Sequence, residues 1–142
     1  MADLEPDILI IEDSDEDAEL TIRALKKHNL KILRLIDGVE GLDFMNGNGK
    51  FSNRNLSAKP RVIFLDLKMP RIDGLEVLSK IKSNNDTKSI PVVVLASTED
   101  DPNIKRAYDL GANSYIVKPV DAENFMTTIT GLGLYWLFTN KV

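Results

Sequence analysis

The sequence predicts an α/β fold in which a mostly parallel sheet carries helices on both faces. Two features support this prediction: short apolar runs rich in β-branched residues recur along the chain, and segments with the period of an amphipathic helix separate them. Continuous apolar runs are typical of strands buried on both faces, and strands that alternate with helices are typical of a doubly wound parallel sheet. The strand–helix unit occurs five times, which gives a (βα)5 arrangement.

Five runs are candidate strands. The three strongest are residues 8–11, 62–65 and 92–95, which are continuously apolar and too short for a buried helix. The two weaker candidates are residues 32–36 and 114–117. Right-handed crossover connections between parallel strands then fix most of the topology.

The first helix is expected just after Ser14, which resembles the start of a capping box with Asp17. Acidic residues crowd its first turn and basic residues 26–28 end it, and both signs of charge match the helix dipole. His28, the only histidine, is interpreted as part of this basic surface group rather than as a phosphocarrier.

Four more helices follow from their apolar positions. We expect a short helix over residues 39–44, two longer helices over 75–81 and 104–110, and a last helix over 121–139. Residues 46–59 contain two Asn-Gly pairs and few apolar side chains, so they are expected to form a long surface loop.

Length and composition limit the class of protein. The 142 residues correspond to one domain, placed at residues 1–142, and the absence of cysteine excludes disulfides and thiolate metal sites. A net charge of −4 argues against a nucleic-acid partner, since nucleic acids favour basic surfaces. The N-terminus lacks the layout of a signal peptide, and no run approaches the roughly 20 apolar residues of a membrane span. A cytoplasmic protein without a membrane partner is therefore expected.

Charged side chains follow several of the predicted strands. Glu12 and Asp13 come after the first strand, Asp66 ends the third, and Lys118 follows the fifth. In an open α/β sheet, ligands bind beyond the carboxyl ends of the strands, so these side chains are expected to converge at one edge. Taken singly, an acidic pair or a Lys-Pro pair is also typical of a solvated helix start or loop end. Their joint occurrence at successive strand ends favours a functional site.

Crowded carboxylates repel one another unless a cation shares the site. Mg²⁺ binds one or two protein carboxylates together with waters and phosphate oxygens. With Lys118 as a second positive charge, such a site suits phosphoryl transfer, and a carboxylate such as Asp66 can act as the nucleophile.

Four motifs resemble the response regulator receiver domains of two-component systems: ILIIED, IFLDLKMPRIDGLE, VVVLAS and YIVKP. They occur in the family's order and cover nearly the whole chain. The resemblance implies a flavodoxin-like sheet with strand order 2-1-3-4-5. It also implies a signalling protein rather than an enzyme, with output through protein–protein contacts.

The resemblance assigns roles by position. Asp66 corresponds to the phosphoacceptor that takes a phosphoryl group from a sensor histidine kinase, and Lys118 to the residue that binds the phosphoryl oxygens. Asp13 corresponds to a direct Mg²⁺ ligand, Glu12 to one that acts mainly through water, and Lys68 to one that binds through its backbone carbonyl. The peptide bond before the proline that follows Lys118 is often cis in this family.

One position departs from the family. Where receivers carry a switch hydroxyl, this chain has Ala96, and the neighbouring Ser97 should point to the opposite face of the strand. Tyr115 occupies the aromatic switch position. Because Ala96 has no hydroxyl, an alternative hypothesis is a receiver-like interaction module that is not phosphorylated.

The C-terminal segment has more apolar surface than one helix face needs. Leu134, Tyr135, Leu137 and Phe138 add to it, which favours a homodimer through the helix of residues 121–139, with intramolecular packing as the alternative. The segment GLYWLFTN resembles the single-domain response regulators of bacterial and cyanobacterial phytochromes, which implies a phytochrome-type kinase as partner.

Two enzyme or cofactor classes are less well supported. A haloacid dehalogenase-type phosphatase would need an Asp-x-Asp motif, but Asp66 is followed by Leu67 and Lys68. Flavodoxin-like FMN binding would need a phosphate-binding loop after the first strand, where this chain has acids that repel phosphate.

Overall fold

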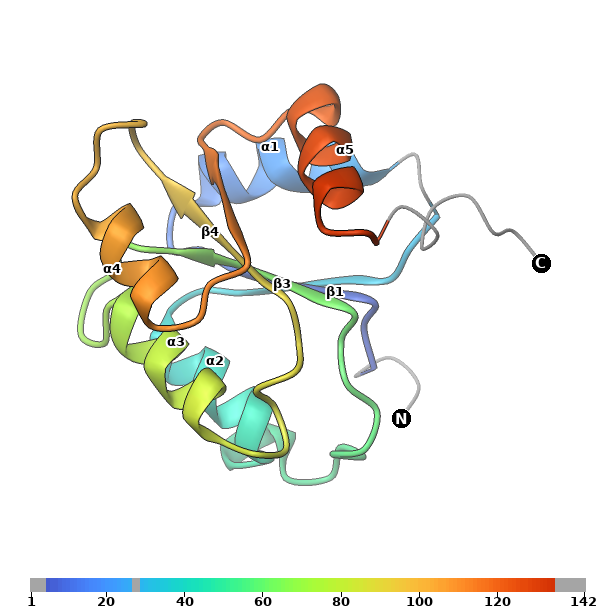
Figure 1. Cartoon of the computed structure of the whole chain (residues 1–142). Helices are drawn as coiled ribbons and strands as arrows, with labels where there is room; N and C mark the ends of the chain where they lie inside the picture. The colour runs from blue at the N-terminus through green and yellow to red at the C-terminus, as the bar shows by residue number, and fades with distance from the viewer. Residues whose placement is uncertain (1–4, 27–28, 135–142) are drawn as a thin grey trace.

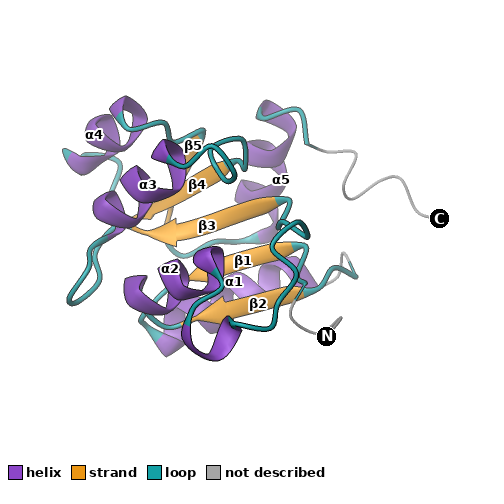
Figure 2. Ribbon diagram, turned by 90° about the horizontal axis from the view of Figure 1, so that it is seen from below, coloured by secondary structure: helices purple, strands orange, loops and turns teal. Residues whose placement is uncertain are grey.

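The computed structural model describes residues 5–26 and 29–134. Its centre is a five-stranded parallel sheet in the order β2-β1-β3-β4-β5, which confirms the predicted fold class and strand order. Figure 2 shows this order, with all strand arrows pointing the same way. The strands are β1 (Ile8–Ile11), β2 (Ile32–Leu35), β3 (Val62–Asp66), β4 (Val92–Ala96) and β5 (Ser114–Val117).

Helices cover both faces of the sheet. In Figure 1, α1 and α5 lie on one face, while α2, α3 and α4 lie on the other. Their bounds are α1 (Asp15–Leu25), α2 (Gly38–Asn46), α3 (Gly74–Ser83), α4 (Asn103–Asp109) and α5 (Ala122–Gly131), with a short 3-10 helix, η3 (Gly49–Phe51), after α2. Within the described residues, no helix is long and apolar enough to cross a membrane.

The apolar core has two halves, one on each side of the sheet. Successive side chains of a strand point to opposite faces, so Leu9 and Ile11 join the half under α2, α3 and α4, while Ile8 and Ile10 join the half under α1 and α5. Both sets are fully buried, which explains why β1 shows no alternation of polar and apolar residues. Full burial of each such side chain contributes about 1.5–3 kcal/mol.

Side-chain caps begin four of the helices. Ser14 Oγ accepts a hydrogen bond from the Asp17 amide, and Asp37, Asp73 and Asp121 accept from the amides three residues later. Such caps each contribute typically about 1 kcal/mol. Because parallel strands all run the same way, these helix N-termini lie near the edge where the strands end, and the polar residues of the sequence gather there.

The predicted loop over residues 46–59 is more structured than expected. It contains η3, and both Phe51 and Arg54 are buried. The Arg54 guanidinium carbon lies 3.9 Å from the centroid of the Phe44 ring, and its nitrogens donate to the carbonyls of Phe44 and Ala58. The few apolar residues of this segment concealed its packing, because an arginine buried over an aromatic ring is indistinguishable in sequence from a surface arginine.

The last helix is shorter than the predicted 121–139. It begins after the Asp121 cap as expected, but α5 ends at Gly131, and Gly133 has a φ of +74°, a conformation typical of a helix C-terminus. Leu134, predicted to face a dimer partner, is half-buried against the core half under α1 and α5. Tyr135, Leu137 and Phe138 lie outside the described residues, as does His28.

Candidate functional site

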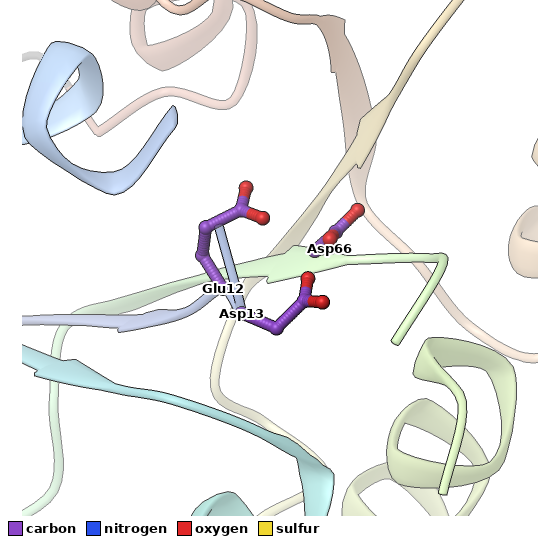
Figure 3. Close-up of side chains that lie close together, drawn as sticks. All are labelled: Glu12, Asp13 and Asp66. Carbon is purple, nitrogen blue, oxygen red and sulfur yellow. The ribbon is translucent and has the colours of Figure 1, made fainter. Parts of the chain in front are cut away.

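Three carboxylates meet where β1 and β3 end. Glu12 and Asp13 directly follow β1, and Asp66 is the last residue of β3. One carboxylate oxygen from each lies within 4.8 Å of the others, and Figure 3 shows the three side chains gathered at these strand ends. Glu12 and Asp66 are buried, whereas Asp13 is exposed. The structure therefore brings the predicted acids together at one edge.

A close approach of helix α3 fixes the backbone at Asp66. A Cβ atom at Gly74, the first residue of α3, would overlap the carbonyl oxygen of Asp66. The Gly74 amide donates to the carbonyl of Leu67 at 3.0 Å, and the Leu67 amide donates to the carbonyl of Leu95 in β4 at 3.2 Å. The turn after Asp66 thus needs a glycine at position 74, because only glycine lets the helix lie against the strand end.

Lys118 extends into the acid cluster from the end of β5. Its amide donates to the carbonyl of Ala96 at 2.8 Å, and the bond from Lys118 to Pro119 is cis, as the family resemblance leads one to expect. Its Nζ lies 3.3 Å from Asp66 Oδ1 and 3.4 Å from Glu12 Oε1. A third acid, Asp17, is closer still, with Oδ2 at 3.1 Å.

Sequence reasoning missed Asp17 as a member of this site. It interpreted Asp17 only as part of the helix cap, and that interpretation accounts for its amide, which donates to Ser14 Oγ. The signal that could have found it is its place in the first turn of a helix that begins at the same edge of the sheet as Lys118.

The acids are electrostatically strained. Burial, a hydrogen bond to Asp66 and repulsion from its charge together raise the pKa of Glu12 to about 8, against the smaller lowering effects of Lys118 and the Ser14 amide. Burial also raises the pKa of Asp66, although its contacts with Glu12 and Lys118 partly offset the rise. One lysine therefore does not neutralise this cluster.

The pKa of Lys118 is also raised, which for a lysine favours the charged form. Burial alone would lower the pKa of its ammonium group, but the negative charges of Asp66, Asp17 and Glu12 outweigh burial and raise the pKa above its ordinary value. Lys118 is thus a cation at neutral pH.

The donor set fits a hard divalent cation. Three carboxylates converge within 4.8 Å, and burial together with the neighbouring Asp66 raises the pKa of Glu12, so a second cation would stabilise the charged form of the acids. Oxygen ligands of this kind suit Mg²⁺. Lys68 lies beside the cluster, since its amide donates to Asp66 Oδ1 at 3.3 Å.

The predicted switch residues are not part of the acid cluster. Ala96 ends β4 and is buried, while Ser97 after it is exposed. Tyr115 in β5 is half-buried, and its ring packs edge-on against Tyr108 of α4, with 6.3 Å between the ring centroids.

An open cavity of about 460 Å³ borders the acid cluster at Asp13. Asp13 and Lys68 line it from the strand ends, and Asn103 and Arg106 line it from α4. Both cations, Lys68 and Arg106, are exposed. The cavity thus has two exposed cations in its lining together with Asp13.

The sequence pattern of the response regulator receiver domain family matches residues 8–130. The chain belongs to this family. The match confirms the resemblance seen in the four motifs, and it makes the chain a signalling module rather than a classical enzyme. Receiver domains accept phosphoryl groups from histidine kinases and bind Mg²⁺ at an acidic pocket.

Two relatives align with nearly the whole receiver domain. The probable methanogenesis regulatory protein FilR2 of Methanothrix harundinacea (strain 6Ac) is 37% identical over 139 residues, which are 94% of this chain and 85% of that protein. Response regulator Rcp1 of Synechocystis sp. (strain ATCC 27184 / PCC 6803 / Kazusa) is 38% identical over 136 residues, which are 93% of this chain and 89% of that protein.

Solved structures point the same way. The bacteriophytochrome response regulator AtBRR is 41% identical with a TM-score of 0.83, covering 94% of this chain and 96% of that one. The Mn(2+)-bound form of Rcp1 is 34% identical with a TM-score of 0.75, covering 95% and 96%. The phosphorylated cyanobacterial phytochrome response regulator RcpA is 32% identical with a TM-score of 0.76, covering 95% and 95%. The chain is thus a two-component response regulator receiver with phytochrome response regulators among its homologues.

Proposed function

We propose that this receiver domain accepts a phosphoryl group on Asp66 from a sensor histidine kinase, with Mg²⁺ bound beside it. The observation that carries the proposal is the arrangement of Asp66: a buried carboxylate at a strand end, 3.3 Å from Lys118 Nζ and within 4.8 Å of two further acids. A nucleophile, a fixed cation and a set of oxygen ligands are what phosphoryl transfer requires.

The side chains then have distinct tasks. An oxygen of Asp66 attacks the phosphorus of a phosphohistidine, the P–N bond breaks with its electron pair leaving on the histidine nitrogen, and an aspartyl phosphate forms. Lys118 neutralises charge on the phosphoryl oxygens. Glu12, Asp13, Asp66 and the backbone carbonyl of Lys68 would hold Mg²⁺. When bound, Mg²⁺ supplies the positive charge that the acids and the phosphoryl oxygens together need.

The names of two structural homologues support the proposal. One is a response regulator with Mn²⁺ bound, and another is a phosphorylated phytochrome response regulator. Both share the fold over 95% of this chain. They favour the same two events, cation binding and phosphorylation, at the acid cluster of this chain.

We infer that the kinase is of the phytochrome type and that the receiver acts in the cytoplasm through protein contacts. The similarity to AtBRR and Rcp1 supports this inference. We also infer a homodimer through residues 121–139, with an interface that includes Leu134, Tyr135, Leu137 and Phe138.

A receiver-like module that works without phosphorylation is the second candidate. The observation that favours it is Ala96, which is buried where receivers of the resembled type carry a hydroxyl. Without that hydroxyl, a phosphoryl group on Asp66 would lack one hydrogen-bond donor, and its presence would be harder to transmit to Tyr115.

Labelling by a small phosphodonor tests both candidates. With Mg²⁺ and acetyl phosphate, wild-type protein should gain the mass of one phosphoryl group, while Asp66→Asn should gain none. The exposed Asp100 supplies a control, since Asp100→Asn changes the charge equally and should label as wild type does. The same samples, examined by light scattering with a beryllofluoride mimic, report any change in oligomeric state.

Each outcome separates the candidates. Labelling of wild type and Asp100→Asn but not Asp66→Asn, with a change in mass by light scattering, supports the phosphorylation switch. Equal behaviour of wild type and Asp66→Asn would contradict phosphorylation at Asp66 and favour the constitutive module.

A further inference from the structure

We propose that Asp17 is a positioning residue that restrains Lys118 in the unphosphorylated protein and thereby slows phosphorylation of Asp66. This inference rests on the proposed function, because it concerns the rate of that reaction. It assigns a regulatory role at the site to an acid that lies outside the three-carboxylate cluster.

The distances single out Asp17 among the partners of Lys118. Lys118 Nζ lies 3.1 Å from Asp17 Oδ2, closer than its 3.3 Å to Asp66 Oδ1. The side chain of Asp17 is 33% exposed, whereas that of Asp66 is 4% exposed. Asp17 therefore attracts the ammonium group from the solvent side of the site, while Asp66 attracts it from the buried side.

The backbone of Asp17 is held on both sides, so its carboxylate is free for Lys118. Its amide donates to Ser14 Oγ at 3.2 Å, and its carbonyl accepts a hydrogen bond from the Thr21 hydroxyl at 3.0 Å. Thr21 is itself buried. None of these bonds uses the Asp17 carboxylate, which is therefore available to Lys118.

Lys118 is equally constrained, so the pair is set by the fold. Its amide donates to the carbonyl of Ala96 at 2.8 Å, and its side chain is only 14% exposed. The ammonium group has three carboxylate partners in reach: Glu12, Asp17 and Asp66. Glu12 and Asp66 belong to the cluster that would surround a cation and a phosphoryl group, whereas Asp17 does not.

Asp17 opposes phosphorylation through its contact with Lys118. Its negatively charged carboxylate competes with the incoming phosphoryl oxygens for the ammonium group of Lys118. Removing that charge while keeping the shape should therefore raise the rate of phosphorylation, by about fivefold, the upper range for a partly exposed ion pair.

The direction of the effect distinguishes this role from a structural one. If Asp17 merely helped the site to fold, or held Lys118 in the productive position, its replacement would slow phosphorylation. If Asp17 restrains Lys118, its replacement accelerates the reaction, and only in the presence of Lys118.

The test compares Asp17→Asn with Glu16→Gln at saturating Mg²⁺ and fixed ionic strength. Glu16 lies in the same first turn of α1, is exposed, and loses the same charge, so it controls for the helix dipole and the general field. Initial rates of labelling by acetyl phosphate should rise about fivefold in Asp17→Asn, and Glu16→Gln should stay near wild type. In a Lys118→Met background, Asp17→Asn should have no further effect.

Three outcomes would overturn the inference: a rate for Asp17→Asn no higher than that of Glu16→Gln, a slower rate, or an acceleration that persists without Lys118. A wild type labelled at Asp66 together with any of these leaves the proposed function intact and rejects the role of Asp17. A wild type that is not labelled at all contradicts both proposals.

Discussion

Two partly buried lysines lie at opposite edges of the sheet, and their surroundings differ. Lys118 lies at the carboxyl ends of the strands, within 3.4 Å of three carboxylates. Lys82 of α3 reaches the segments that precede β4 and β5. Its Nζ donates to the carbonyl of Lys88 at 3.0 Å, the carbonyl of Ile90 at 2.8 Å and Oδ1 of Asn113 at 3.1 Å.

The oxygens around Lys82 are neutral, whereas those around Lys118 carry charge. Burial lowers the pKa of Lys82, with no carboxylate to oppose it, while the acids around Lys118 overcome burial and raise its pKa. Neutral carbonyls satisfy a cation and leave nothing further to neutralise. Carboxylates leave an excess of negative charge that attracts a second cation. The charge of the partners, rather than the burial of the lysine, therefore distinguishes the functional edge of the sheet.

The largest expected effect is on the reaction rate when Lys118 is replaced. Lys118→Met should lower the rate of labelling by acetyl phosphate by about 10²-fold, because one preorganised positive group near the phosphoryl oxygens is lost. Initial rates by intact mass, with far-UV circular dichroism to verify folding, measure it. A folded Lys118→Met variant that labels at the wild-type rate would contradict a role for Lys118 in phosphorylation.

Replacement of Lys82 should affect stability instead. Lys82→Met removes the ammonium donor from the carbonyls of Lys88 and Ile90 and from Asn113 Oδ1, which keeps its bond from the Val92 amide. The free energy of unfolding should therefore fall by about 1–3 kcal/mol. Urea denaturation measures this loss. The labelling rate should stay at the wild-type value, and a reduced rate in folded protein would show that the two edges are not independent.

The smallest effect concerns alkaline pH, where the two lysines should act with opposite signs. The folded-state pKa of Lys82 lies below its ordinary 10.5, so the folded protein binds fewer protons there and its contribution to stability rises as pH increases toward 10.5. The folded-state pKa of Lys118 lies above 10.5, so its contribution is complete below that pH and is lost as pH rises through the folded-state value.

Urea denaturation at several alkaline pH values separates these contributions. Each lysine contributes at most about 1.4 kcal/mol per pH unit. Relative to wild type, Lys82→Met should remove a part of the free energy of unfolding that rises with pH. Lys118→Met should remove a part that falls with pH. Components of the same sign in the two variants would contradict the assignment.

The strands were predictable from the sequence because strands buried on both faces appear as continuous apolar runs. The expected 8–11 and 114–117 agree with β1 and β5, and 62–65 and 92–95 each fall one residue short of β3 and β4. The convergence of Glu12, Asp13, Asp66 and Lys118 was also predictable, since parallel strands bring their carboxyl ends to one edge.

What escaped prediction depends on contacts between distant residues. Asp17 pairs with Lys118 from the opposite end of the chain, and its local role as part of a helix cap concealed that contact. Arg54 is buried because its guanidinium group lies over the Phe44 ring and donates to two carbonyls. The periodicity of apolar residues in the sequence does not indicate these contacts. The end of α5 at Gly131 was hidden by apolar residues that continue beyond it.

The contact between Gly74 and the carbonyl oxygen of Asp66 has a consequence for protein design. Transplanting the acids and the lysine onto another parallel sheet would reproduce the functional groups but not the site, unless the helix that follows the central strand could begin in contact with that strand's end. A residue without any side chain is therefore as much a part of the transferable unit as the carboxylate eight residues before it. The smallest graft that preserves the geometry is the whole strand–turn–helix corner.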